Sequence, residues 1–209
     1  MRELVLASRN AGKARELSQL IDLPDLRIRA VSEFFGPEFV VEETGETFEE
    51  NAWIKASAVC SGTGRLALAD DSGLEVDALG GRPGVHSARF AGEAASDDDN
   101  NALLLRELAG VPSEERTARF RAVLVVAAWD NGRAVRVARS EGVLEGFIVH
   151  APRGTGGFGY DCLFEPACSR GRTTAEMSAS EKNAISHRGH AARALKSALV
   201  SWFAGAPSV

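Results

Sequence analysis

The stretch Glu3-Leu4-Val5-Leu6-Ala7-Ser8-Arg9-Asn10-Ala11-Gly12-Lys13 decides the class of fold. Its first five residues form a short apolar run, which is typical of a buried strand. After the polar, glycine-containing loop, apolar residues recur at helical spacing from residue 14 to residue 21, and Pro24 stops the pattern. A strand that enters a helix through such a loop predicts an α/β protein.

The same loop has the properties of an anion site. It offers free backbone N–H groups, the positive end of a helix dipole and the ammonium group of Lys13. The alternative is an ordinary turn in which Asn10 caps the helix and Lys13 is solvated. Because the spacing is not that of a P-loop, the residues alone leave both interpretations open.

Further patterns along the chain predict a mixed sheet. Strands are expected over residues 66–69, 117–129, 134–139 and 142–149, with Asp130-Asn131-Gly132 as a hairpin turn. Helices are expected after the capping boxes Thr47/Glu50 and Ser178/Glu181 and over residues 102–108, and Gly189 leaves one or two C-terminal helices open. Helices, a central hairpin and a final helix indicate a mixed β-sheet flanked by helices.

Composition excludes several classes of protein. The chain has 209 residues, little more than one domain, with 24 Lys and Arg against 29 Asp and Glu, so an acidic total argues against a protein that coats nucleic acid. The apolar run at residues 122–129 is too short to cross a membrane, and residues 1–13 do not have the pattern of a secretory signal. Three cysteines (Cys60, Cys162 and Cys168) cannot all pair. We expect a cytoplasmic protein.

Two acidic segments predict a divalent cation site. Carboxylates from the segments 42–46 and 70–73 could share Mg²⁺, which prefers oxygen ligands and carries phosphates with it. Because neighbouring residues of a strand point to opposite faces, only one of Asp70 and Asp71 can face such a site. Solvation is the simpler interpretation for Glu46, Glu49 and Glu50, and Asp97-Asp98-Asp99 is interpreted as a solvated helix cap.

Two later segments supply groups for a nucleobase. The glycine-rich segment 154–161 contains Phe158 and Tyr160, whose rings could stack on a base or simply fill the core. The segment 178–189 adds Lys182, His187 and Arg188 as donors in an acidic chain. Cations for phosphates, carboxylates for Mg²⁺ and an aromatic loop for a base together predict a nucleoside triphosphate ligand.

In these segments the chain resembles the non-canonical purine NTP pyrophosphatases, the inosine/xanthosine triphosphate pyrophosphatase family. The resemblance runs through nearly the whole chain in order, over residues 6–13, 42–45, 48–52, 69–74, 79–85, 87–92, 154–161 and 185–189. It implies hydrolysis of ITP, dITP and XTP to the monophosphate and pyrophosphate with Mg²⁺, by a homodimer that cleanses the nucleotide pool. The implied fold is a single domain over 1–209, with a long mixed sheet flanked by helices and two lobes about a central cleft.

The resemblance also implies roles for individual residues. The triphosphate-binding loop would be Ser8, Arg9, Asn10, Ala11, Gly12 and Lys13. Glu42 and Asp71 would be the Mg²⁺ ligands, Asp71 the proton acceptor and Ser72 a substrate contact. The residues around base and phosphates would be Phe158, Gly159, Tyr160, Asp161, Lys182, His187 and Arg188. Donors among them would meet the 6-keto group of hypoxanthine or xanthine, which adenine lacks.

Three other interpretations compete with this one. A Maf-type pyrophosphatase would act on pyrimidine or modified nucleotides, although the segment Ser186-His187-Arg188-Gly189 favours purines. A catalytically silent nucleotide sensor would keep the pocket, but Glu42 and Asp71 argue against it. A purely structural protein would leave the clustered glycines and carboxylates unexplained.

Overall fold

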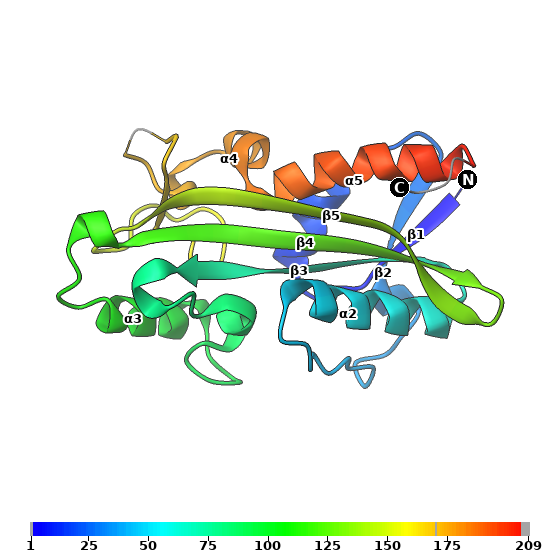
Figure 1. Cartoon of the computed structure of the whole chain (residues 1–209), viewed down its shortest axis with the longest axis horizontal. Coiled ribbons are helices and arrows are strands. Elements are labelled where there is room, and N and C mark those ends of the chain that lie inside the picture. Colours follow the sequence, from blue (N-terminus) through cyan, green and yellow to red (C-terminus); the bar gives the residue numbers. More distant parts are fainter. Residues whose placement is uncertain (1, 170, 206–209) are drawn as a thin grey trace. The chain divides into compact units, whose positions relative to one another are not determined.

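The computed structural model describes residues 2–169 and 171–205. Within them, six strands form one sheet in the order β2-β1-β3-β4-β5-β6. The strands are β1 (Arg2–Leu6), β2 (Leu26–Ala30), β3 (Leu66–Val76), β4 (Thr117–Asp130), β5 (Arg133–Ile148) and β6 (Phe164–Pro166). The α-helices are α1 (Ala11–Leu20), α2 (Phe48–Thr63), α3 (Asp97–Glu107), α4 (Ala179–Ile185) and α5 (His187–Phe203), as Figure 1 shows. Short 3-10 helices lie at Val31–Glu33, Asp77–Leu79, Gly84–Arg89, Ser113–Glu115 and Thr174–Glu176.

The sheet is mixed in direction. Strand β1 pairs in parallel with both β2 and β3, whereas β6 pairs antiparallel with β5. Strands β4 and β5 are joined by Asn131 and Gly132, whose φ angles of 47° and 80° are left-handed. A two-residue turn with two positive φ angles is the connection that suits a tight hairpin. The predicted mixed α/β class and the predicted hairpin are therefore confirmed.

The chain divides into two compact units. The described parts of residues 1–71, 122–142 and 188–209 form unit 1, and residues 72–121 and 143–187 form unit 2 within the described ranges. The chain passes from one unit to the other inside β3, β4 and β5, and again between His187 and Arg188. Two units agree with the predicted two lobes, while the central cleft and the single-domain assignment remain predictions.

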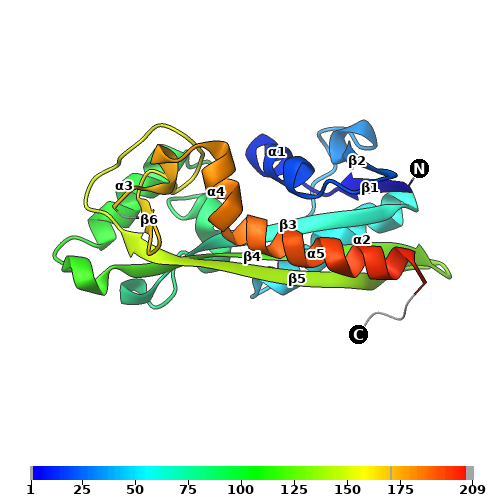
Figure 2. The ribbon, with the colours of Figure 1, turned by 90° about the horizontal axis from the view of Figure 1, so that it is seen from above.

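Unit 1 is held together by apolar packing on both faces of its strands. Leu4, Leu68 and Leu124 cluster with Leu17 of α1 and Leu195 of α5. Their neighbours along each strand alternate to the opposite face. In Figure 1, α2 and α5 lie on opposite sides of the long strands, and Figure 2 shows α5 running along them. This packing fixes where β1 ends and the loop that leads into α1 begins.

Unit 2 has a core of its own. Leu104 of α3 and Leu108, its C-cap residue, pack in one cluster with Leu74 of β3, Phe120 of β4 and Phe164 of β6. These side chains are almost entirely buried, with exposed fractions from 0% to 8%. The packing anchors α3 beside the segment that follows β5.

Local signals in the sequence located several element ends correctly. The capping boxes of Thr47 with Glu50 and of Ser178 with Glu181 are both present. The C-terminal segment forms two helices, but the break lies at Ser186, whose ψ of 152° is extended, and not at Gly189. The segment 154–161 contains no helix or strand, as expected from its glycines.

Other boundaries differ from the prediction. Strand β3 does not end at Ala69 but continues through the acidic segment to Val76, because its charged side chains find partners. Residues 134–139 and 142–148 belong to one strand, β5, which ends one residue before the predicted 149. Helix α3 begins at Asp97, five residues before the predicted start at 102. The short strands β2 and β6 were not predicted. Among the described residues, no helix is long and apolar enough to cross a membrane.

Two neighbouring residues of α5 test the core of unit 1. Leu199 is 0% exposed, whereas Val200 is 52% exposed. We expect Leu199→Ala to lower the free energy of unfolding by about 2–5 kcal/mol, because it leaves a cavity. Val200→Ala is the matched control and should change it by less than about 0.5 kcal/mol. Denaturant unfolding monitored by circular dichroism measures both, and equal effects would contradict the packing.

Candidate active site

The loop between β1 and α1 combines a helix cap with a partly buried lysine. Asn10 caps α1 by accepting a hydrogen bond from the backbone N–H of Lys13 at 3.0 Å, and Ser8 Oγ accepts one from the N–H of Asn10 at 3.2 Å. Ala11 and Gly12 form the first turn of the helix. The capping role considered for Asn10 is therefore confirmed. Arg9 turns away and donates to the backbone carbonyl oxygens of residues 35 and 36.

The side chain of Lys13 is held by a buried carboxylate. Its Nζ lies 3.3 Å from Asp70 Oδ2, and the side chain of Asp70 is fully buried. Arg188 Nε lies 3.1 Å from the same oxygen, and Arg188 also pairs with Glu16 of α1. Burial lowers the pKa of Lys13, against the opposing attraction of Asp70. Solvation of Lys13 is thus not what the structure shows.

Asp71 contacts a different helix, as strand alternation predicts. Its Oδ1 lies 2.6 Å from Nζ of Lys55 in α2, whereas Asp70 shares the face of Leu68 with α1 and α5. Burial raises the pKa of Asp71 to about 6, although the nearby charges of Lys55 and Lys13 lower it. Its Oδ2 is buried and has no hydrogen-bond partner among the described residues. One oxygen of the Asp71 carboxylate is therefore left without a hydrogen-bond partner in a cluster of paired charges.

Lys55 is a further member of this charged cluster, and the sequence analysis missed it. It also lies 3.2 Å from Glu43 Oε2, and its side chain is only 13% exposed. One feature of the sequence could have indicated its role. Lys55 lies between Ile54 and Ala56 among the apolar residues of α2, where a solvated lysine is not expected.

Glu43, rather than Glu42, lies beside Lys55 in the structure. Glu42 is exposed, whereas Glu43 is partly buried and interacts with both Lys55 and Asp71. Attraction to Lys55 holds the pKa of Glu43 below its ordinary value although burial opposes this. The sequence assigned Glu42 as a metal ligand. That assignment remains a prediction, and the geometry offers its neighbour as the alternative.

The glycine-rich segment is organised around Asp161, whose carboxylate is almost completely buried. Asp161 Oδ2 lies 2.7 Å from Lys182 Nζ and accepts the backbone N–H of Phe158 at 2.9 Å. Lys182 Nζ also lies 4.9 Å from the centre of the Phe158 ring, a cation–π contact. Gly157 has a φ of +78°, and a Cβ there would lie 2.0 Å from Asp161 Oδ2. The structure thus brings Phe158, Asp161 and Lys182 together.

The remaining predicted residues of unit 2 have mainly structural contacts. Tyr160 is 4% exposed and donates to the carbonyl oxygen of Ser87 at 2.8 Å, so its ring fills the core. Burial, and then the charge of Asp97, raises the pKa of Tyr160. The His187 ring stacks on Phe120 with centroids 4.8 Å apart. Ser72 lies in β3 and is half-buried.

The site residues form two groups, one in each unit. The group in unit 1 combines buried or partly buried cations with carboxylates, which suits a polyphosphate and a divalent cation: Lys13, Glu43, Lys55, Asp70, Asp71 and Arg188. The group in unit 2 offers a ring and hydrogen-bonding side chains, which suits a heterocycle: Phe158, Gly159, Asp161, Lys182 and His187. Arg188, which the resemblance places with His187 around the base and phosphates, is here paired with the carboxylates of Glu16 and Asp70 in unit 1.

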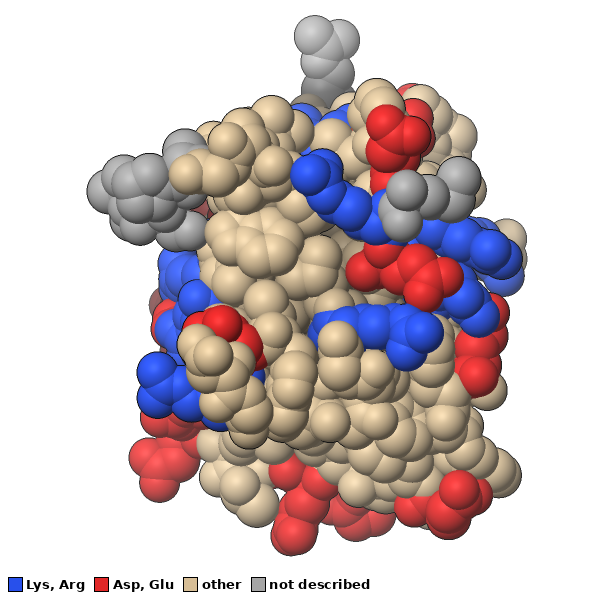
Figure 3. All heavy atoms as spheres, turned by 90° about the vertical axis from the view of Figure 1, so that its right-hand side faces the viewer, with Lys and Arg blue, Asp and Glu red and all other residues tan. Residues whose placement is uncertain are grey.

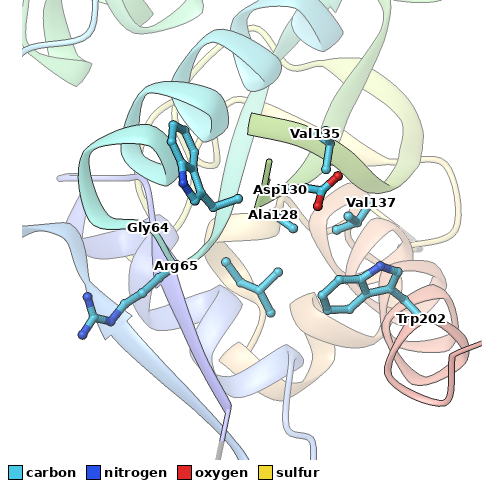
Figure 4. A pocket seen from close by; sticks show the side chains of 9 residues that line it. Gly64, Arg65, Ala128, Asp130, Val135, Val137 and Trp202 are labelled. Atoms are coloured by element: carbon cyan, nitrogen blue, oxygen red, sulfur yellow. The ribbon is translucent and has the colours of Figure 1, made fainter. Parts of the chain in front are cut away.

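A separate hollow in unit 1 contains none of the predicted site residues. It has a volume of about 420 Å³ and is lined by Gly64, Arg65, Leu66, Ala128, Trp129, Asp130, Val135, Val137 and Trp202 (Figure 4). On the face shown in Figure 3, acidic and basic side chains intermingle with neutral surface. Neither feature brings together cations and buried carboxylates as the group of Lys13 and Lys55 does.

Comparison with known proteins places the chain in a family. The sequence model of the Ham1 family matches residues 4–198. The chain belongs to the Ham1 family. This Ham1 chain is 51% identical over 197 residues to a protein of Geobacter sulfurreducens named dITP/XTP pyrophosphatase, covering 94% of this chain and 96% of that one. It is 52% identical over 192 residues to the dITP/XTP pyrophosphatase of Geobacillus kaustophilus, covering 91% of each.

Solved structures agree with the family assignment. The structure of a HAM1 protein from Coxiella burnetii has a TM-score of 0.84 to this Ham1 chain at 41% identity, and covers 96% of this chain and 100% of that one. The predicted resemblance and the mixed α/β class of the fold are therefore confirmed.

The contact between Lys55 and Asp71 predicts an effect on the pKa of Asp71 that can be measured without metal. Because Lys55→Met removes the cation 2.6 Å from the carboxylate, we expect the pKa of Asp71 to rise above its value of about 6. Carbon-13 NMR titration of the carboxyl group measures the change. Lys182→Met, which removes an equally buried lysine from Asp161, is the matched control and should leave Asp71 unaffected. An unchanged or lower pKa in Lys55→Met would refute the assignment.

Proposed function

We propose that this Ham1 chain hydrolyses deaminated purine nucleoside triphosphates (ITP, dITP and XTP) to the monophosphate and pyrophosphate with Mg²⁺. The observation that carries the proposal is Asp71, a buried carboxylate in contact with Lys55 and in the field of Lys13, with one oxygen available. The names of the relatives from Geobacter and Geobacillus support the substrate class. Such an activity would remove deaminated purines from the nucleotide pool.

The residues present fit a magnesium ion. Mg²⁺ is usually held by one or two carboxylates, with waters and substrate phosphates as its other ligands. Asp71 Oδ2 and the neighbouring carboxylate of Glu43 offer that set, and the described residues contain no group of three or more side chains that would form a complete metal cage. When bound, Mg²⁺ would neutralise phosphate oxygens and orient the attacking water.

The cations of unit 1 would bind the triphosphate. The N-terminus of α1 and the side chain of Lys13 present positive charge at the same loop. Lys55 is close enough to Asp71 and Glu43 to neutralise them in the free protein, and would turn to phosphate oxygens when the nucleotide binds. Binding would thus exchange carboxylate partners for phosphate partners.

Asp71 would take the proton from the water that attacks the α-phosphorus. A pKa of about 6 makes it a stronger base than an ordinary aspartate, and it remains largely ionised at neutral pH. Lowering the pH through this value would protonate Asp71 and remove both its metal-binding and its base function. Hydrolysis should therefore decline below about pH 6.

The second group would recognise the base. The partly exposed ring of Phe158 offers a stacking surface beside Lys182. Lys182 and His187 can donate to the 6-keto oxygen of hypoxanthine or xanthine, while the 6-amino group of adenine would leave these donors unpaired. The resemblance places Arg188 around the base and phosphates. To contact the nucleotide, Arg188 would have to break its ion pair with Asp70 or bind the nucleotide while still paired.

We further propose that the protein is a cytoplasmic homodimer whose single two-lobed domain spans 1–209. The homodimer and the domain assignment rest on the family resemblance. Three free cysteines, one of them exposed, are compatible with a reducing compartment.

An assay with ITP tests the proposed function. We expect inosine monophosphate and pyrophosphate, rather than inorganic phosphate, with Mg²⁺ and no turnover with EDTA. In Asp71→Asn, kcat should fall by ~10²–10⁴-fold, because both the base and a metal ligand are weakened, while ITP still binds. Calorimetric titration with ITP checks binding. Near-normal turnover of this variant would exclude Asp71 from the mechanism.

Glu42 and Glu43 provide a matched pair for the metal site. If Glu43 completes the site with Asp71, Glu43→Gln should raise the Mg²⁺ concentration for half-maximal activity by ~10-fold or more, because a charged ligand is lost. Glu42→Gln should then change it by less than ~2-fold. A larger effect of Glu42→Gln would instead support the assignment made from the sequence.

A further inference from the structure

Asp97 makes a contact that a solvated helix cap does not need. Its Oδ2 accepts the backbone N–H of Gly159 at 2.6 Å, across 62 positions of the chain. The capping of α3 is done by other residues, because Ser96 and Asp99 form the capping box. The sequence interpretation of Asp97-Asp98-Asp99 as a solvated cap is therefore incomplete, since Asp97 also holds the glycine-rich segment.

A second residue of the same helix holds the other side of Gly159. Asn101 Nδ2 donates to the carbonyl oxygen of Gly159 at 3.0 Å, and Asn101 is 6% exposed. Residues four positions apart lie on one face of a helix, so Asp97 and Asn101 form one surface. Gly159 has a φ of +62°, a backbone conformation that favours glycine. Its N–H and C=O groups are thus both fixed by α3.

Gly159 lies between two aromatic residues of different exposure, Phe158 and Tyr160. Tyr160 is anchored in the core by Ser87, whereas the Phe158 ring is partly exposed beside Lys182. The backbone of Phe158 is fixed on one side by Asp161 and on the other by the peptide that Asp97 holds. The direction of the Phe158 ring therefore depends on α3.

We propose that Asp97 and Asn101 are positioning residues that fix Gly159 and thereby hold the Phe158 ring ready to stack on the purine. This inference rests on the proposed function. Neither residue touches the nucleotide. Both act through the backbone of Gly159, so their loss should weaken recognition of the base and spare that of the phosphates.

The decisive variants lie in one turn of α3. Asp97→Ala removes the acceptor, Asp97→Asn keeps an acceptor oxygen, and Asp98→Ala removes an equal charge from the neighbouring exposed position. For ITP, Asp97→Ala should raise KM by ~10-fold with kcat changed by less than ~3-fold, because loss of a stacking surface mainly weakens binding. Asp97→Asn and Asp98→Ala should both stay within ~2-fold of the parent protein in KM.

Inhibition by inorganic tripolyphosphate distinguishes binding of the phosphates from binding of the base. Tripolyphosphate has no base, so its inhibition constant should be the same in Asp97→Ala and in the parent protein. A parallel loss of ITP and tripolyphosphate binding, or an equal effect of Asp98→Ala, would overturn the proposal, because either would indicate a general effect of charge or stability. Asn101→Ala should reproduce the KM effect of Asp97→Ala.

Hydrogen exchange tests the contact without any nucleotide. The amide of Gly159 should exchange ~10-fold faster in Asp97→Ala than in Asp98→Ala, because its acceptor is lost. Unchanged exchange would overturn the role of Asp97 even if ITP is a substrate. Failure of the parent protein to hydrolyse ITP would instead overturn the proposed function, and with it the assignment of the Phe158 ring to a purine.

Discussion

The arrangement of unit 1 depends on one buried carboxylate, that of Asp70. A charge fully removed from water is tolerated only when opposite charges and hydrogen bonds surround it. Asp70 finds Lys13 at the start of α1 and Arg188, 118 positions away, at the start of α5. The chain must therefore bring α1, β3 and α5 to one point, and the loop between β1 and α1 is positioned by the same requirement.

The side chain of the next residue, Asp71, lies on the opposite face of β3. Asp71 meets Lys55 of α2, with Glu43 on the other side of the ammonium group. Consecutive aspartates thus contact different helices: Asp70 pairs with residues of α1 and α5, and Asp71, the proposed metal ligand and base, pairs with α2. Because the side chains of a strand alternate, a shift of one residue in β3 would exchange these two roles.

Features that depend on neighbouring residues could be predicted from the sequence. Features that depend on contacts between distant parts of the chain could not. The capping boxes, the hairpin turn and the opposed directions of Asp70 and Asp71 follow from near neighbours in the sequence, and all are present. Lys55 was missed because its role depends on how α2 packs against β3. The three-residue strand β6 has no pattern of its own and exists because β5 pairs with it. Asp97 was underestimated because acidic first turns are usually solvated, and its partner is far along the chain.

Gly157 has a consequence for attempts to redesign the base preference of this protein. Any side chain there would collide with the Asp161 carboxylate, which also holds Lys182 and the backbone of Phe158. A mutagenesis library that randomises the whole segment would consist largely of clones with a displaced carboxylate. Substitutions are better restricted to Phe158, with Gly157 and Asp161 held constant. The side chain that would face the heterocycle then changes, while the contacts of Asp161 with Lys182 and with the backbone of residue 158 are kept.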